Sequence, residues 1–278
     1  MEQHGKRIKS NEEALAAFVR DNAEAVASVL NSGALREAFQ AALQEIQANT
    51  ARPLDSFASV AAHMEGADGK NRYRVGDVIR MRHDDFGLIQ WRVIGVDVDQ
   101  AAGSKHTLTV ATEHIEAYRW FANPNEDHPM GGNHYMSSAI RFYLNHDFFS
   151  GMPEEDAETV MITCRPCTEH NEASSAWDRV WLLSASEVGL EGAGIPHEGK
   201  TYPWYTQEDG KEQRKAMDMH SAKAAYWLRT PSTVYDYFVR SVSKGGSLGH
   251  ISAYDRGGVL AACVIGSKDT DERRNQHE

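Results

Sequence analysis

The chain has 278 residues, of which 41% are hydrophobic and 25% are charged, and these values are ordinary for a soluble globular protein. A formal net charge of −11 argues against nucleic acid or an anionic membrane as partner, because either would require a basic face. The length suffices for one large domain or two small ones.

The sequence carries no pattern typical of export. Residues 1–20 contain no apolar segment followed by a small-residue cleavage site, and no apolar run is long enough to span a bilayer. Three cysteines do not make a disulfide framework. We therefore expect no signal peptide, and a protein that stays in the cytoplasm or leaves the cell as part of a phage virion.

The clearest helical pattern lies in residues 11–47. Apolar residues recur there at spacings of three and four, and the pattern is interrupted once at 31–33. Two amphipathic helices of this kind cannot bury their apolar faces alone, so they pack on the following domain or pair with other chains in a homo-oligomer. The residues expected to be buried are Leu15, Phe18, Val26, Leu35, Phe39 and Leu43.

We assign the helical N-terminal segment to residues 1–65. Residues 49–70 show little periodicity and contain a proline and two glycines, which is typical of a linker. A short helical turn is predicted within it, at residues 54–64.

A strand pattern begins after residue 72. Residues 75–79 and 88–96 are predicted to be two strands joined by a polar turn at 83–85, and residues 108–111 add a third strand. Residues 118–136 are predicted to be a loop because they contain two prolines and a pair of glycines.

A prominent helix and several short elements follow. Ser137 or Ser138 caps an amphipathic helix that ends at Phe148. Further along we expect a short acidic helix start at 153–160, a buried strand at 180–183, a helical turn at 184–188 and a long loop at 189–214.

The most informative stretch is 225–266, which mixes Tyr, Ser, Asp, His, Thr and Phe with Gly. Such a mixture suits a binding surface, because aromatic side chains give large contact area and the polar ones give adaptable hydrogen bonds. From Leu228 to Gly266 there is no Glu, Gln, Met or Trp and only one Lys. Codons that end in a pyrimidine encode none of these five types, so Asn codons randomised at their adenines would leave this gap. A meander of strands whose composition arose by chance is the competing interpretation, since strands also avoid Glu, Lys and Gln.

Eleven positions in this stretch carry residue types that randomised Asn codons produce. We predict that they form one exposed ligand-binding surface: Ser232, Tyr235, Asp236, Tyr237, Phe238, Ser241, Ser243, Ser247, His250, Ser252 and Tyr254. The scaffold beneath is expected to consist of Trp227, Leu228, Val239, Val242, Gly245, Gly246, Gly257, Gly258 and Val259. Most of the binding energy is expected from the aromatic members Tyr235, Tyr237, Phe238 and Tyr254.

Four blocks of sequence, at 135–149, 179–188, 226–232 and 257–265, occur in a recognisable order. In that order they resemble a bacterial family of unknown function, DUF6273, with a C-type-lectin-like fold. Some members of that family look like the variable proteins of diversity-generating retroelements. The family usually closes with a Gly-Val-Arg-Pro-Ala pattern, where this chain has Gly-Val-Leu-Ala-Ala at 258–262.

This resemblance covers about residues 75–266 and implies the fold, the domain limits and the partner. It implies an α+β, C-type-lectin-like domain at 73–266, followed by a charged tail at 267–278. It also implies a ligand-binding protein whose C-terminal region is diversified and whose target is a protein or a cell surface.

Two other functions compete with a diversified binder. One is an oxidase-type enzyme similar to formylglycine-generating enzymes, which have a related fold and use cysteines near their C-terminus; here it would act through Cys263 or through the pair Cys164 and Cys167. The other is a structural or receptor-binding subunit of a phage tail without diversification. The polar stretch lacks a nucleophile, base and orienting group in any recognisable spacing, so we predict that the protein is not an enzyme.

Cys164, Cys167 and His170 have the spacing of half a zinc site or of a redox pair. A structural zinc needs four ligands, and no second pair is present to complete the set. A redox pair needs its first Cys at the start of a helix, whereas the residues up to 175 are predicted to be a loop. Cys263 lies in an apolar run and is predicted to be a buried strand thiol. We therefore expect two loop thiols, one buried thiol, and no metal, cofactor or catalytic residue.

Overall fold

The computed structural model describes residues 56–128, 131–207 and 210–267. The chain divides into two compact units, residues 1–52 and 53–278, so every described residue belongs to the second unit. The predicted N-terminal helices and nearly all of the predicted tail lie outside the described residues. The same holds for the side chains expected to be buried there, which are Leu15, Phe18, Val26, Leu35, Phe39 and Leu43.

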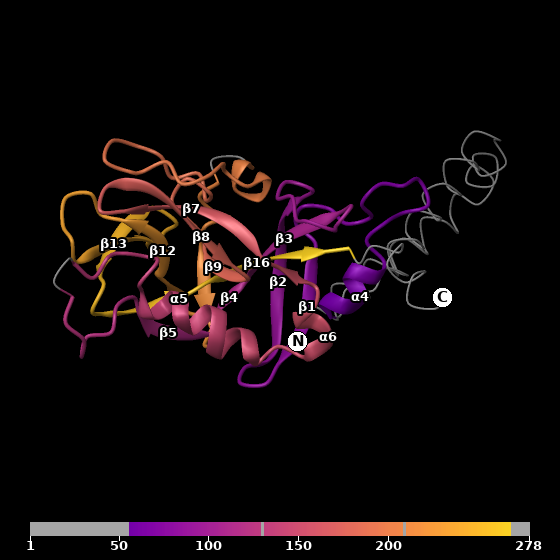
Figure 1. Cartoon of the computed structure of the whole chain (residues 1–278), viewed down its shortest axis with the longest axis horizontal. Coiled ribbons are helices and arrows are strands. Elements are labelled where there is room, and N and C mark those ends of the chain that lie inside the picture. Colours follow the sequence, from indigo (N-terminus) through magenta and orange to yellow (C-terminus); the bar gives the residue numbers. More distant parts are fainter. Residues whose placement is uncertain (1–55, 129–130, 208–209, 268–278) are drawn as a thin grey trace, which may run out of the picture. The chain divides into compact units, whose positions relative to one another are not determined.

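The last strand, β16 (Ala261–Gly266), lies in the middle of the main sheet (Figure 1). It pairs antiparallel with β3 (Thr107–Thr112), with β6 (Val160–Met161) and with β9 (Val180–Leu182). The strands predicted near 108–111 and 180–183 are therefore confirmed as β3 and β9. The final residues of the domain close a sheet whose other strands come from much earlier in the chain.

The main sheet continues from β3 into an antiparallel hairpin. β2 (Gly87–Val96) pairs with β3, and β1 (Val78–His83) pairs with β2 at the edge. The strand predicted at 88–96 and the polar turn before it are confirmed. The first strand begins at Val78 and runs to His83, so it starts and ends later than the predicted range 75–79.

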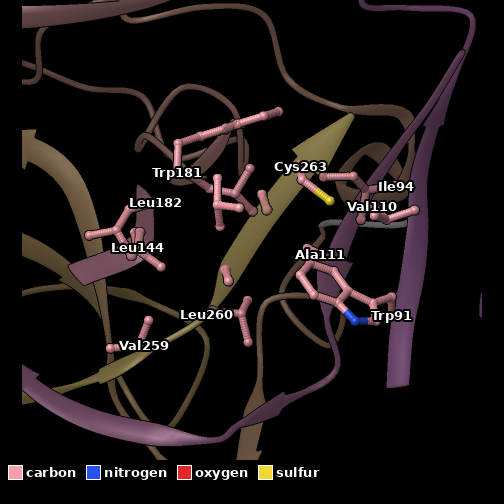
Figure 2. Packing of buried hydrophobic residues seen from close by; sticks show 14 of the residues in the cluster. Trp91, Ile94, Val110, Ala111, Leu144, Trp181, Leu182, Val259, Leu260 and Cys263 are labelled. Atoms are coloured by element: carbon pink, nitrogen blue, oxygen red, sulfur yellow. The ribbon is translucent and has the colours of Figure 1, made fainter. Parts of the chain in front are cut away.

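The core surrounds β16 on both faces. Cys263, Val264 and Ile265 are all fully buried, which explains why this strand is a continuous apolar run. Trp91 of β2 and Trp181 of β9 contribute large buried side chains to the same core (Figure 2). Burial of one such apolar side chain stabilises the fold by about 1.5–3 kcal/mol. Cys263 is confirmed as a buried strand thiol.

A short helix, α4 (Phe57–Ala62), belongs to this core. Ser56 caps it by accepting a hydrogen bond from the Ser59 N–H, and Phe57 packs edge-on against Trp91 with ring centroids 5.2 Å apart. The helical turn predicted here is confirmed, but the interpretation of the segment as a linker is wrong. One turn holds too few apolar positions to display a period, so its burial depends on the sheet that it covers.

A second sheet of five strands carries the stretch that the sequence analysis singled out. Its order is β14 (Leu248–Ser252), β13 (Phe238–Val242), β12 (Tyr226–Pro231), β15 (Arg256–Val259) and β5 (Ala117–Trp120). β12 and β15 are parallel, and the other neighbours are antiparallel. β12 and β13 lie together at one end of Figure 1.

The loop predicted for 118–136 begins too early. Tyr118 and Trp120 belong to β5, where Tyr118 pairs with Gly258 and Trp120 with Arg256 of β15. The partner strand is far away in the sequence, so no local turn or hairpin signal marks β5 as a strand.

The prominent helix is confirmed, with a change of pitch that the sequence does not indicate. Ser138 caps α5 (Ala139–Tyr143) by accepting a hydrogen bond from the Arg141 N–H, and the helix continues as a π-helical turn, η1 (Leu144–Phe148). The acidic helix start predicted nearby is α6 (Glu154–Ala157).

The cysteine pair lies on a hairpin and not in a loop. β7 (Thr163–Glu169) and β8 (Glu172–Asp178) pair along their whole length. His170 and Asn171 form the two-residue turn between them with positive φ values of 52° and 63°, the geometry of a type I′ turn. The loop prediction for 168–175 is wrong because few of these residues are apolar, and the pairing instead depends on the turn.

The remaining elements are short. A three-stranded sheet has the order β11 (Lys223–Ala224), β10 (Ala216–Asp218) and β4 (His114–Ile115). The long connection predicted after residue 189 contains only the 3-10 turn η2 (Pro203–Thr206) in its described part. The described residues therefore form a mixed α+β fold made mostly of strands, with few and short helices.

Candidate binding surface

Four aromatic side chains gather at the end of the second sheet, and we call them the aromatic cluster: Tyr235, Tyr237, Phe238 and His250. Ring centroids lie 5.8 Å apart for Tyr235 and Tyr237, 4.6 Å apart for Tyr237 and Phe238, and 4.7 Å apart for Phe238 and His250. Tyr235 is 53% exposed and Tyr237 is 42% exposed. Large rings rarely remain this open without a binding role when they lie together, so the cluster is a candidate contact surface.

The loop that carries the tyrosines, residues 232–238, is held by its main chain. The side-chain amide of Asn133 lies 3.0–3.1 Å from the carbonyl oxygens of Ser232, Tyr235 and Phe238. The backbone N–H groups of Gly132 and Asn133 both donate to the carbonyl oxygen of Asp236. None of these bonds uses a side chain of the loop, so its side chains can change without loss of these bonds.

Two glycines let the supporting chain approach this loop. Gly131 has a φ of +95°, and a Cβ there would lie 2.6 Å from the Cβ and the carbonyl oxygen of Asp236. A Cβ on Gly132 would lie 2.8 Å from the hydroxyl of Tyr254. Since real Cβ atoms do not approach that closely, the Gly-Gly pair is required for the contact. This pair is the signal in the sequence that could have pointed to Asn133, which our sequence analysis missed.

Ser232 and Ser241 do not belong to the exposed surface, which corrects the prediction for both. Ser232 is 9% exposed, and its hydroxyl accepts hydrogen bonds from the N–H groups of Val234 and Tyr235. Ser241 is 2% exposed because it shares the inward face of β13 with Val239. Both residues have the predicted type. However, the alternation of side chains along β13 places the Ser241 hydroxyl on the inward face, and the local hydrogen bonds draw the Ser232 hydroxyl inward.

Ser243 and Ser252 are half-buried and serve the local backbone. The hydroxyl of Ser243 accepts from the Ser247 N–H, and that of Ser252 accepts from the Tyr254 N–H. Such bonds are the usual role of serine in turns. Both therefore lie at the margin of the surface rather than at its centre.

The other predicted positions face outward to different degrees. Asp236 and Ser247 are exposed, and Tyr254 is half-buried with its ring centroid 5.7 Å from that of His128. The structure thus leaves an exposed set of Tyr235, Asp236, Tyr237, Ser247 and His250.

The predicted scaffold residues lie beneath the surface with one exception. Trp227 is fully buried, and its indole N–H donates to the Arg119 carbonyl oxygen at 2.9 Å. A Cβ on Gly257 would lie 2.5 Å from the Trp227 ring, so the indole packs directly on that backbone. Gly245 is exposed in the turn between β13 and β14. The other buried members are Leu228, Val239, Val242, Gly246, Gly258 and Val259.

A pocket of about 270 Å³ adjoins the aromatic cluster, between residues 231–236 and two histidines. The rings of His134 and His170 lie 3.8 Å apart, and His134 Nδ1 lies 3.4 Å from a Glu169 carboxylate oxygen. The hairpin turn of β7 and β8 therefore forms one wall of the pocket and the loop 232–238 forms the other. The proximity of these histidines to the loop was not predicted, because His134, His170 and the loop come from separate segments of the sequence.

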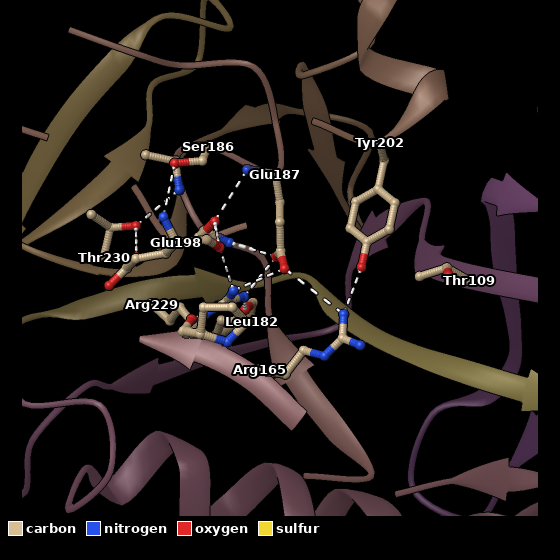
Figure 3. Close-up of polar contacts among 12 residues, drawn as sticks. Thr109, Arg165, Leu182, Ser186, Glu187, Glu198, Tyr202, Arg229 and Thr230 are labelled. Atoms are coloured by element: carbon tan, nitrogen blue, oxygen red, sulfur yellow. Dashed lines mark hydrogen bonds and ion pairs between the residues drawn. The ribbon is translucent and has the colours of Figure 1, made fainter. Parts of the chain in front are cut away.

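A buried polar network anchors β12 next to this loop (Figure 3). Arg229 is fully buried, and two of its guanidinium N–H groups donate to the two carboxylate oxygens of Glu187 at 2.6 and 2.8 Å. Its other N–H groups donate to the carbonyl oxygens of Leu182, Pro166 and Glu198. All five donors of the guanidinium thus have acceptors.

The charged groups of this network are buried, so their interactions with one another oppose the loss of solvation. Burial alone would lower the pKa of Arg229, but the adjacent Glu187 carboxylate more than opposes it and raises that pKa. Burial raises the pKa of Glu198, whose carboxyl accepts a hydrogen bond from the Thr230 hydroxyl. The network holds Arg229 charged and fixes where β12 ends and the loop begins.

The three cysteines are free thiols, of which one is exposed and two are buried. Cys164 and Cys167 stand three apart on a strand, so they face opposite sides, one exposed and one buried. Burial raises the pKa of Cys167 to about 11, and burial raises the pKa of Cys263 as well. The His170 ring lies beside that of His134, with the centroids 3.8 Å apart. Within the described ranges, no group of three or more His, Cys, Asp or Glu side chains could hold a metal ion.

A family model described as a domain of unknown function (DUF6273) matches residues 106–267. That span is more than half of the 278 residues. The chain belongs to the DUF6273 family. The DUF6273 match begins just before β3 and ends just after β16, so it includes the whole aromatic cluster. No curated protein and no solved structure matches the chain. Among the described residues, no helix is both long and apolar enough to cross a membrane.

Proposed function

We propose that this DUF6273 protein is a ligand-binding protein with a diversified surface, the variable protein of a diversity-generating retroelement. Its domain has a C-type-lectin-like fold, and its target is a protein, on a cell surface or free. The surface consists of the aromatic cluster, the exposed residues Asp236 and Ser247, and the adjoining pocket between the loop and the histidines.

The observation that carries the proposal is the way residues 232–238 are held. Asn133 and Gly132 bind the loop only through its carbonyl oxygens. A fold tolerates diversity only where side chains do not decide its stability, because its total stability is only about 5–15 kcal/mol. A main-chain clamp with exposed side chains satisfies that condition.

The chemistry of the exposed set favours a protein target. Tyrosine presents a large rigid surface with a hydroxyl at its end, and such side chains dominate protein recognition. Truncation of one of these rings should cost about 1–3 kcal/mol of binding energy.

An enzyme related to formylglycine-generating enzymes is the weaker candidate. The nucleophilic form of cysteine is the thiolate, and burial raises the pKa of both Cys167 and Cys263. Cys164 is exposed, but it lies on the opposite face of its strand from Cys167. We therefore propose a binding protein and not an oxidase.

Two randomised libraries test the proposal. The first randomises the exposed set, Tyr235, Asp236, Tyr237, Ser247 and His250, and the second randomises an equal number of buried positions, Trp227, Leu228, Val239, Ser241 and Val242. Both are displayed on yeast, treated with protease, and selected on immobilised lysozyme. Most members of the first library should survive protease and some should bind, whereas few of the second should survive. Equal survival of both libraries, or no binders from the first, would contradict the proposal.

The DNA around the gene tests diversification itself. We expect a near-identical repeat that carries adenines where the codons of the exposed set differ, next to a reverse transcriptase gene. A repeat without adenine-directed differences, or no repeat at all, would leave a binding protein that is not diversified.

A further inference from the structure

β14 ends the five-stranded sheet, and in the described part of the chain β13 is the only strand that pairs with it. Two hydrogen bonds, one before β14 and one after it, show which of its residues bond to β13. The Ser243 N–H donates to the Ser247 carbonyl oxygen, and the Ala253 N–H donates to the Tyr237 carbonyl oxygen. Bonded and non-bonded pairs alternate in an antiparallel ladder. Gly249 therefore bonds β13, and the residues on either side of it do not.

The backbone of Leu248, His250 and Ser252 consequently points away from the sheet. The Ser252 carbonyl oxygen accepts a bond from the Asp255 N–H at 2.9 Å. For the three N–H groups, and for the carbonyl oxygens of Leu248 and His250, no hydrogen bond is found within residues 56–128, 131–207 and 210–267. Such a row of donors and acceptors is chemically complementary to the backbone of an extended chain.

This edge lacks the usual devices that prevent pairing. The β13–β14 register runs without a bulge, and β14 contains no proline, lysine, arginine, aspartate or glutamate. His250 is exposed at the middle of the strand, and its ring lies 4.7 Å from Phe238 of the aromatic cluster. The free edge and the diversified side chains thus form one continuous surface.

We propose that the target binds as an extended polypeptide segment that adds a strand to β14. Backbone bonds to Leu248 and His250 give affinity that survives any change of the diversified side chains. Phe238 and His250 select an apolar or aromatic residue at alternate positions of that segment. This inference rests on the proposed function and specifies the class of its target.

Hydrogen exchange of the free full-length chain gives the first test. The amides of Leu248, His250 and Ser252 should exchange quickly, while those of Gly249 and Ile251 should be protected by β13. Protection of the first three in the free chain at a concentration where it sediments as a monomer would show that another part of the chain covers the edge. Protection only in a sedimenting dimer would show that a second copy covers it. Either result overturns the proposal.

Binding uses a displayed library of random twelve-residue peptides selected on the full-length chain, and the best peptide is made synthetically. His250→Pro removes the outward N–H but spares the ladder to β13, since proline is tolerated where an edge N–H faces solvent. His250→Ala is the matched control, because it keeps the backbone. We expect the proline variant to bind the peptide about tenfold more weakly than the alanine variant. If the proline variant unfolds, N-methylation of alternate peptide residues tests the same bonds and should weaken binding with a period of two.

The outcomes separate this inference from the proposed function. Equal binding by both His250 variants and no alternation in the peptide, or no enriched peptide, overturns strand addition. If a triple Tyr235→Ala, Tyr237→Ala, Phe238→Ala variant then fails to bind the selected peptide, the proposed binding role of the diversified surface stands and strand addition is rejected. If the proline variant loses binding and the triple variant keeps it, strand addition stands and the proposed role of the aromatic cluster fails.

Discussion

β12 joins two regions that are held in opposite ways. At Arg229 the fold depends on side chains, since one guanidinium satisfies Glu187 and three carbonyl oxygens in a fully buried site. Three residues later, the loop 232–238 depends on main-chain carbonyl oxygens that bind Asn133 and Gly132. The first region therefore depends on the identity of its side chains. The loop depends on its main chain and, among its own side chains, on the inward Ser232 hydroxyl.

One domain can therefore place a core held by specific side chains next to a loop held largely by its main chain. A buried charge without its partner costs several kcal/mol, so we expect removal of Arg229 alone to be strongly destabilising. Exposed side chains away from special contacts usually change stability by only about 0.5 kcal/mol. The boundary between the two regimes lies within a few residues of Pro231.

The largest effect is expected from Arg229→Met. It removes the bidentate partner of the buried Glu187 carboxylate and leaves only Arg165, whose nearest guanidinium nitrogen is 3.9 Å away. The free energy of unfolding should fall by about 3–5 kcal/mol in urea titrations. The double variant Arg229→Met, Glu187→Met should recover part of this loss, because it also removes the carboxylate that the single variant leaves without its bidentate partner. A loss below about 1 kcal/mol for the single variant would contradict a side-chain-dependent core.

Asn133→Ala should have the next largest effect, because it removes the donor that three loop carbonyl oxygens share. We expect a loss of about 3 kcal/mol of unfolding free energy and faster amide exchange in residues 232–238. Asn125→Ala, at an exposed position, is the control and should change neither. If the loop amides exchange alike in both variants, the main-chain clamp is not what orders the loop.

Ser241→Tyr and Ser247→Tyr test whether Ser241 points into the domain while Ser247 points into solvent. A residue that points inward opposite Gly249 has no room for a ring, so the first variant should lose about 2 kcal/mol of unfolding free energy. Ser247 is exposed, so the second should unfold at nearly the wild-type Tm. Equal Tm values in the two variants would show that Ser241 belongs to the exposed surface, as first predicted.

The smallest effect is a dependence on pH that comes from Glu198. Burial raises its folded pKa above the ordinary value of 4.5, so the folded state binds this proton more tightly than the unfolded state does. Its contribution to stability is therefore present below the unfolded pKa and is lost as the pH rises through the folded pKa. Unfolding free energies measured from about pH 4 to about pH 7 should decline less in Glu198→Gln than in the wild type. Parallel declines would exclude Glu198 as the source.

The elements with local signals could be predicted from the amino-acid sequence. Alternating apolar residues marked β1 and β2, a continuous apolar run marked β16, and a serine cap marked α5. The composition of 225–266 also drew attention to the stretch that carries the aromatic cluster. Each of these signals acts within about ten residues, which is the range over which a single sequence can be read.

Which distant residues come into contact depends on how the sheets pair. Ser241 and Ser247 are the same residue type in the same stretch, and the pairing of β13 with β12 and β14 makes one buried and the other exposed. Asn133 lies about a hundred residues from the carbonyl oxygens that it binds, and Arg229 is 42 residues from Glu187. Strand parity and long-range contacts depend on how sheets pair, and that pairing follows from the burial of the whole core rather than from any one segment.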